Sequence, residues 1–177
     1  MRVLKYSLLG LLAVVALILL IGMALPSTYK VERSIEISAP MINVYPKVYD
    51  PKGWAQWGVW NRRDPGMQMT YSGPPAGVGA KWEWKSKSEG NGGMEIVKAD
   101  FDKTVAYVLT IEGMDSKLSG RLDFANAGSK VKVTWVGEGD MGMNPLGRWF
   151  ALFMDKLLGP DFEGSLKNLK ELAERKG

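Results

Sequence analysis

The chain has 177 residues, of which 46% are hydrophobic and 24% are charged, and its formal net charge is +4 at pH 7. This length fits one domain with a modest extension, and the composition excludes a disordered chain. The sequence contains no cysteine and no histidine. That excludes disulfides, thiolate or imidazole metal sites and any catalytic triad with an imidazole base. We therefore expect no metal site and no cofactor.

The N-terminal segment is the most hydrophobic part of the chain. Residues 6–25 carry no charge and are rich in Leu, Val, Ile and Ala, and Pro26 follows them. As a helix, this run spans about 30 Å, the thickness of the bilayer hydrocarbon. A cleaved signal peptide stays open as the alternative, because a basic start and small residues near the end are present, but the apolar run is long for one. Residues 1–26 are therefore interpreted as an anchor that crosses the membrane once, through residues 6–25.

Charge indicates the orientation and the class of partner. Arg2 and Lys5 precede the apolar run and favour a cytoplasmic N-terminus, although Lys30 and Arg33 just beyond the run weaken this bias. The globular part is thus expected on the extracytoplasmic side. Without Arg2 and Lys5, the chain holds 21 basic and 19 acidic residues, a net charge too weak for nucleic-acid binding. The sequence does not indicate an oligomeric state.

Residues 27–177 contain no linker or internal repeat and are predicted to form one domain. Its first element is a strand over 29–38, in which apolar and polar residues alternate. A short helix over 40–49 is expected next, with a proline near its first turn. Residues 50–63 then carry three tryptophans spaced by three residues, which a helical turn places on one side.

Period-two patterning dominates the middle of the chain, and turn residues interrupt it at regular intervals. Successive strands joined by such turns predict an antiparallel meander with one apolar, aromatic face and one charged face. One of the turns is expected at 113–116. The predicted strands are 67–71, 80–86, 94–100, 105–111, 118–124 and 131–135.

The chain closes with a predicted helix. Asn144 and Pro145 match an N-cap followed by proline at the first helical position, and apolar residues then recur at helical spacing. Gly159 and Pro160 predict a break or kink. The whole order predicts an α+β fold in which a curved antiparallel sheet grips the long C-terminal helix, because that arrangement buries both apolar faces.

At this point the chain resembles the START-like (SRPBCC) superfamily, specifically its polyketide cyclase/dehydrase-like branch. The resemblance covers roughly 145 residues and is carried by 31–40 (VERSIEISAP), 54–65, 77–82, 139–142 and the C-terminal helix. It implies a helix-grip fold with a cavity between the sheet and the long helix. It implies no single activity, because the superfamily includes binding, transfer and catalysis, and no catalytic motif is common to its members.

Aromatic residues are the candidate ligand contacts. Together with Met141 and Met143 they would line an apolar pocket for a lipid, fatty acid or polyketide-like molecule. The alternative is that they simply fill the core, as any sheet packed on a helix requires. For the tryptophans of 50–63, a pocket lid or contact with the membrane surface is also open. The candidates are Trp54, Trp57, Trp60, Trp82, Trp84, Tyr107, Trp135, Trp149 and Phe153.

Two polar residues are candidates for a role inside the pocket, and no catalytic residue is assigned. Arg33 follows the apolar parity of its strand and would meet a ligand carboxylate or phosphate. Glu95 has ambiguous facing, since it shares the parity of Val97 and Ala99 while Met94 and Ile96 take the other. If buried, it would serve as a general acid or base. The alternative for both is a salt bridge at the sheet edge or simple exposure.

Three functions are consistent with this pattern. The favoured one is a membrane-anchored, non-catalytic binding protein for a hydrophobic small molecule or lipid. The second is a cyclase- or dehydratase-type enzyme on a hydrophobic substrate, which should show buried polar groups that converge in a cavity. The third is a protein-interaction module, which should show a filled core and an exposed aromatic patch.

Overall fold

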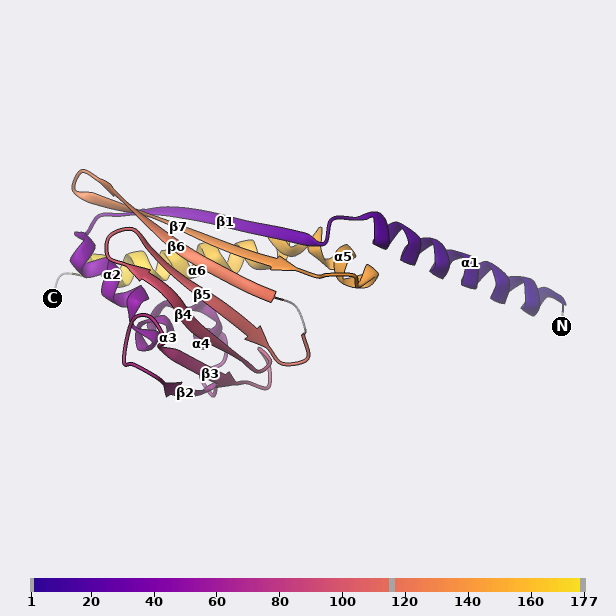
Figure 1. Cartoon of the computed structure of the whole chain (residues 1–177), viewed down its shortest axis with the longest axis horizontal. Helices are drawn as coiled ribbons and strands as arrows, with labels where there is room; N and C mark the ends of the chain where they lie inside the picture. The colour runs from indigo at the N-terminus through magenta and orange to yellow at the C-terminus, as the bar shows by residue number, and fades with distance from the viewer. Residues whose placement is uncertain (1, 115–116, 176–177) are drawn as a thin grey trace.

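The structure is a computed structural model that describes residues 2–114 and 117–175. A seven-stranded antiparallel sheet packs against a long C-terminal helix, and an apolar N-terminal helix projects from one end of this domain (Figure 1). The predicted α+β, helix-grip architecture, with one apolar helix in front of it, is confirmed.

The N-terminal helix α1 (Arg2–Ala24) exposes nearly all its apolar side chains, and Gly22 is its one buried residue among those described. Residues Val3–Ala24 are long and apolar enough to cross a membrane, a property that signal sequences share. Only residues 25–27 connect this helix to the first strand, β1 (Thr28–Ile37). The domain therefore begins directly where α1 ends.

Three short helices follow β1: α2 (Met41–Tyr49), α3 (Pro51–Trp57) and α4 (Val59–Arg63). The side chain of Asp50 caps α3 by accepting a hydrogen bond from the Lys52 N–H, and proline occupies the first helical position. The tryptophan-rich segment, expected as a short helix or helical turn, is thus two short helices, with Trp54 and Trp57 on α3 and Trp60 on α4.

Six strands then form the predicted meander, and β1 pairs with the last of them, so the sheet order is β1-β7-β6-β5-β4-β3-β2. Within β4 the register shifts between Ile96 and Lys98. The predicted turn at 113–116 includes residues 115–116, which lie outside the described residues. The six strands are β2 (Gln68–Ser72), β3 (Lys81–Lys85), β4 (Gly92–Asp100), β5 (Thr104–Ile111), β6 (Lys117–Ala127) and β7 (Lys130–Asp140).

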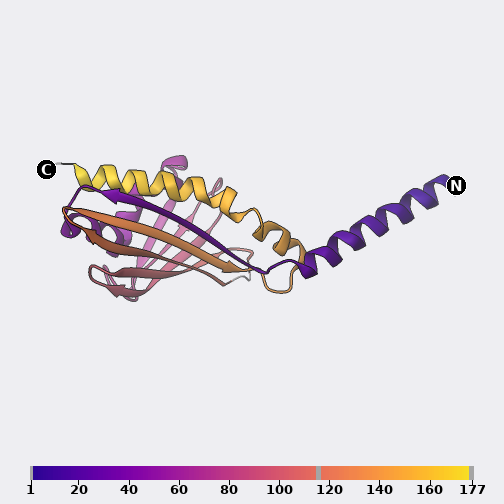
Figure 2. The same ribbon diagram turned by 90° about the horizontal axis from the view of Figure 1, so that it is seen from above.

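The C-terminal helix is interrupted, but not where the sequence predicts. Helix α5 (Pro145–Ala151) ends before Phe153, and α6 (Met154–Glu174) runs without a break through Gly159 and Pro160. Proline removes a single backbone hydrogen bond there. Gly159 does not mark a break in the helix. A glycine is needed at this position because it lies directly against the guanidinium of Arg33. Figure 2 shows α6 lying along β1, with α5 beside the end of α1.

Candidate functional site

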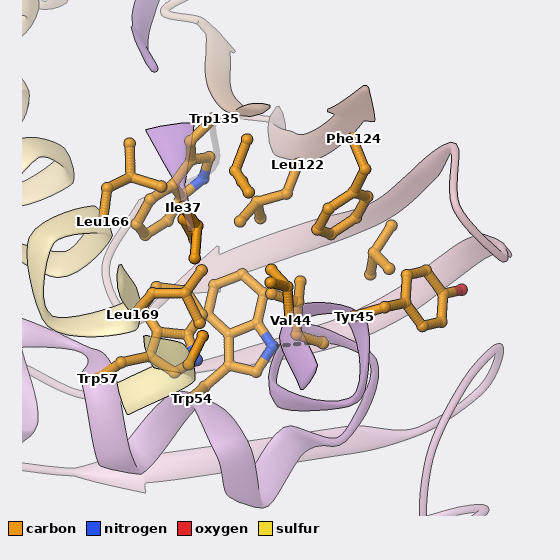
Figure 3. Close-up of a cluster of buried hydrophobic side chains, with 14 of the residues drawn as sticks. Ile37, Val44, Tyr45, Trp54, Trp57, Leu122, Phe124, Trp135, Leu166 and Leu169 are labelled. Atoms are coloured by element: carbon orange, nitrogen blue, oxygen red, sulfur yellow. Dashed lines mark hydrogen bonds between the residues drawn. The ribbon is translucent and has the colours of Figure 1, made fainter. Parts of the chain in front are cut away.

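The inner face of the sheet, which α3 and α6 cover, holds a cluster of large aromatic side chains. Trp54 lies at its centre, with ring centroids 4.6 Å from Trp57, 5.5 Å from Trp82, 5.4 Å from Tyr107 and 5.6 Å from Trp135. Each of these five side chains is at most 5% exposed. Figure 3 shows Trp54 and Trp57 pointing from their helix toward Trp135. We call these five residues the aromatic half of the inner face.

The polar side-chain atoms of Trp54, Trp57, Trp135 and Tyr107 have hydrogen-bond partners. Trp54 Nε1 donates to the Val48 carbonyl at 2.7 Å and Trp57 Nε1 to the Lys47 carbonyl at 2.9 Å. Trp135 Nε1 donates to the Tyr107 hydroxyl at 2.8 Å. Burial raises the pKa of Tyr107 well above its ordinary value, so this phenol stays neutral while its oxygen accepts the Trp135 hydrogen bond.

Helix α6 closes the aromatic half from the other side. The ring of Phe162 stacks on Trp135 with centroids 4.1 Å apart. The same ring covers Gly137, where an added Cβ would lie 2.8 Å from Phe162 Cζ. Side chains therefore occupy this part of the space that the resemblance assigns to a cavity. Trp54 and Trp57, at 5% and 0% exposure, are core residues and do not contact a membrane surface.

The end of the inner face nearer α1 is built differently. Tyr29, Leu109 and Met94 point inward from β1, β5 and β4, and they line up through the pairs Tyr29–Gly139, Gly139–Leu118, Leu118–Leu109 and Leu109–Met94. All three are only partly buried. We call the partly buried apolar residues at this end the α1-side half: Tyr29, Trp84, Met94 and Leu109 from the sheet, with Met154 and Leu158 from α6.

Two surface hollows lie in the described part of the chain, and the larger one also borders Tyr29 and Gly139 of the inward-facing row. One, of about 540 Å³, is lined mainly by exposed residues of β1, β6 and β7 such as Lys30, Ser119 and Glu138, whose side chains point to the outer face. The other, of about 130 Å³, lies between the start of α3 and the loop that follows β2. Charged side chains border the first and the second is small, so neither resembles an enclosed pocket for a large apolar ligand.

The two polar candidates are held in ion pairs outside the core. Arg33 points inward from the edge strand β1, but its guanidinium bonds Asp155 at 2.7 Å and Glu163 at 2.5 Å on α6. Glu95 points to the outer face and pairs with Lys81 at 2.9 Å. Its ambiguous parity has a physical cause, because the register shift at Val97 adds one residue to β4 and reverses the alternation beyond it.

Two of the nine aromatic candidates lie apart from the others, on the α5 side of the domain. Trp149 Nε1 donates to the Ile18 carbonyl of α1 at 3.1 Å, and Phe153 is 50% exposed at the junction of α5 and α6. Trp60 borders the aromatic half, with its ring centroid 6.0 Å from that of Trp135.

The contact between α5 and α1 is a feature that the sequence analysis missed. Arg148 donates to the carbonyls of Met23 and Leu25, at the C-terminal end of α1. Gly22 lets the helices meet, because a Cβ there would lie 2.6 Å from the Pro145 carbonyl oxygen. The sequence does carry a hint of this contact, since Arg148 is the one charged residue between positions 141 and 154 and an isolated charge in an apolar stretch needs a partner.

The curved sheet, the covering α6 and the apolar inner face define a START-like helix-grip protein. A family model described as polyketide cyclase/dehydrase and lipid transport matches residues 28–174. The chain therefore belongs to this polyketide cyclase/dehydrase and lipid transport family. None of the curated proteins compared with the chain matches it.

Solved structures share the fold at low sequence identity. A protein from Chromobacterium violaceum is 20% identical, with a TM-score of 0.59 over 85% of this chain and 99% of that one. Norcoclaurine synthase from Thalictrum flavum is 13% identical, with a TM-score of 0.63 over 85% and 96%. The di-domain ARO/CYC BexL of the BE-7585A biosynthetic pathway is 17% identical, with a TM-score of 0.61 over 85% and 52%. These likenesses establish the fold, and enzymes as well as other proteins share it.

Proposed function

We propose that this protein is a membrane-anchored, non-catalytic protein that binds a hydrophobic ligand, of lipid or polyketide type, on the α1-side half of its inner face. The observation that carries the proposal is the row of partly buried apolar side chains there: Tyr29, Leu109 and Met94, with Trp84 beside them. A ligand that covered them would remove apolar surface from water, which favours binding. The aromatic half would form the closed floor of the site.

The polar groups of the inner face support binding rather than catalysis. Arg33 is paired twice, and Tyr107 is hydrogen-bonded to Trp135. The buried Ser165 and Asn168 of α6 also have structural partners, since Ser165 accepts from the Val59 N–H and Asn168 donates to the Trp57 carbonyl. In the described part of the chain, no buried side-chain nitrogen or oxygen lacks a hydrogen-bond partner. Ser165 and Asn168 hold α4 and α3 on α6. None of these polar groups converges with another on a reacting centre.

Membrane anchoring by α1 is part of the proposal. Its side chains are exposed and apolar, which water disfavours and a bilayer favours. The basic residues Arg2 and Lys5 favour a cytoplasmic N-terminus and an extracytoplasmic domain. On intact cells, a membrane-impermeant maleimide should label a Phe101→Cys variant, because Phe101 is exposed on the domain and the chain has no other cysteine.

Native mass spectrometry of the full chain, purified from its host, tests the binding function. The unaltered chain should retain a lipid-sized adduct, and Leu109→Trp should lose it, because the larger ring fills the α1-side half. Val108→Trp is the matched control, since Val108 is the next residue of β5 and points to the outer face at 41% exposure. Equal adducts on all three chains would place the lipid on α1 and contradict the proposed site.

The filled aromatic half favours a second candidate, a protein-interaction module in which the inner face binds nothing. This function predicts that the same measurement finds no adduct on the unaltered chain, even under gentle purification. No contact described on the inner face favours the third candidate, a cyclase- or dehydratase-type enzyme.

A further inference from the structure

A second apolar surface lies outside the helix grip, on α5 and the first turns of α6. Residues 141–154 contain one charge, on Arg148. The large side chains of this stretch and the next turn face solvent rather than the core, which is unusual for so many in one place. We call this surface the α5 patch; its members and exposures are Met143 (71%), Leu146 (54%), Phe150 (62%), Leu152 (49%), Phe153 (50%) and Leu157 (56%).

The α5 patch continues the apolar surface of α1. Gly22 of α1 packs on Pro145, and Trp149 bonds the Ile18 carbonyl, so α5 lies beside the last turns of α1. The side chains of α1 in these turns, such as Leu20 at 69%, are themselves exposed. Whatever surrounds the end of α1 therefore also meets the patch.

Arg148, the one charge of the stretch, faces α1 and not the surroundings of the patch. Its guanidinium bonds the carbonyls of Met23, Leu25 and Gly142. Carbonyls at a helix C-terminus lack intrahelical partners, and a cation there also complements the helix dipole. Charged side chains resume at Asp155 and Lys156, which are exposed. The patch is thus free of outward-facing charge along α5, and its last member, Leu157, lies one turn after Phe153, past Asp155 and Lys156.

The depth of α5 along α1 fits the headgroup region of a bilayer. Ile18 lies six residues before Ala24, the last residue of α1, which corresponds to about 9 Å of helix. Interfacial helices bury their apolar face about 5–10 Å into the boundary between headgroups and acyl chains. Tryptophan is enriched at that depth, which suits Trp149.

We propose that the α5 patch lies in the lipid interface of the same bilayer that α1 spans, so that the domain rests on the membrane surface. The inference depends on the proposed anchoring by α1. It adds a second contact with lipid, made by the domain itself, and it brings the α1-side half of the inner face next to the bilayer.

Depth-dependent quenching in phosphatidylcholine vesicles tests this proposal on the full chain. Because the chain has no cysteine, single variants Phe150→Cys and Phe153→Cys accept one NBD label each. Leu12→Cys reports the anchor. Phe101→Cys is the matched control, because it replaces a phenylalanine of similar exposure (57%) at the β4–β5 turn, the end of the sheet away from α1.

The expected result is strong quenching by shallow doxyl-labelled lipid at positions 150 and 153, with a blue-shifted emission, and none at position 101. Quenching at position 12 alone would overturn the α5 proposal and leave the anchor intact. Absence of quenching at position 12 would overturn both. Self-quenching between labels at 150, without quenching by lipid, would assign the patch to a second copy of the chain and also overturn the proposal.

Discussion

The two halves of the inner face share strands β3 and β5 but are packed to different degrees. In the aromatic half, Trp57 and Trp135 are at most 1% exposed, and the five rings pack in tilted or edge-to-face pairs with centroids 4.6 to 5.6 Å apart. In the α1-side half, Trp84 shares β3 with Trp82 and Leu109 shares β5 with Tyr107, yet both stay partly exposed. What covers an inward-facing residue therefore decides whether it is core or candidate site, since Trp82 and Met94 are direct partners in the sheet and still differ in burial.

The difference follows from the side chains that each half receives from the helices. Trp54 and Trp57 of α3 and Phe162 of α6 reach the aromatic half, whereas Met154 and Leu158 reach the other. Flexible Met and Leu side chains fill space less rigidly than tryptophan rings and adapt to different neighbours. A helix-grip domain can thus stabilise itself with one half and keep the other for a ligand.

The largest expected effect comes from truncation in the aromatic half. Trp135→Ala removes a ring that contacts Trp54, Trp57 and Phe162, so the free energy of unfolding should fall by about 3–5 kcal/mol. Leu109→Ala in the α1-side half is the comparison, and it should cost less than about 2 kcal/mol because the side chain is already partly exposed. Urea unfolding of the full chain in detergent measures both, and similar losses would erase the distinction between the halves.

A smaller effect is expected from Tyr107→Phe, which leaves Trp135 Nε1 without its acceptor and should cost about 1–3 kcal/mol. The change should also alter the response to alkali. Burial raises the pKa of Tyr107 above its ordinary value of 10.0. Above pH 10.0 the tyrosine therefore ionises in the unfolded chain but not in the folded one, and the free energy of unfolding falls as pH rises. Unfolding measured at about pH 8 and about pH 11 should therefore show a smaller alkaline loss in the variant. An identical loss in both chains would place the sensitive tyrosine elsewhere.

The smallest effect on stability is expected from Gly22→Ala, which affects the border of the α1-side half. The added methyl group would overlap the Pro145 carbonyl and push α5 away from α1, while the free energy of unfolding of the domain should change by less than about 0.5 kcal/mol. Spin labels on cysteines at Leu12 and Leu152 should report a longer, broader distance distribution. Gly10→Ala is the control, because nothing lies within 4 Å of a Cβ at Gly10, and an equal response would argue against the α1–α5 contact.

Local patterns in the sequence predict most of the fold. The strands of the meander and the start of α5 lie within a few residues of their predicted positions, because alternation, turn residues and the Asn144–Pro145 cap act over short distances. Glu95 was ambiguous because a register shift two residues further along β4 depends on the partner strand β5. The helix break was misplaced because Gly159 is needed against Arg33, a residue of β1.

The candidate site was less predictable than the fold. The sequence identifies the aromatic residues, but Trp82 and Trp84 lie on the same face of β3 and differ only in what covers them. Trp149 was grouped with the inner face because it follows helical spacing, whereas its partner is a carbonyl of α1, 131 residues earlier in the chain. Contacts of this kind depend on how distant elements meet, and no local pattern encodes them.

The three-residue connector between α1 and β1 has a consequence for transport. Residues 25–27, even fully extended, reach at most about 10 Å. If α1 spans a bilayer and the domain binds a ligand as proposed, this short tether would keep the domain from diffusing away with that ligand. The domain would take up and release ligand at the leaflet directly beneath it, and delivery to another membrane or to an enzyme would require that acceptor to approach the domain.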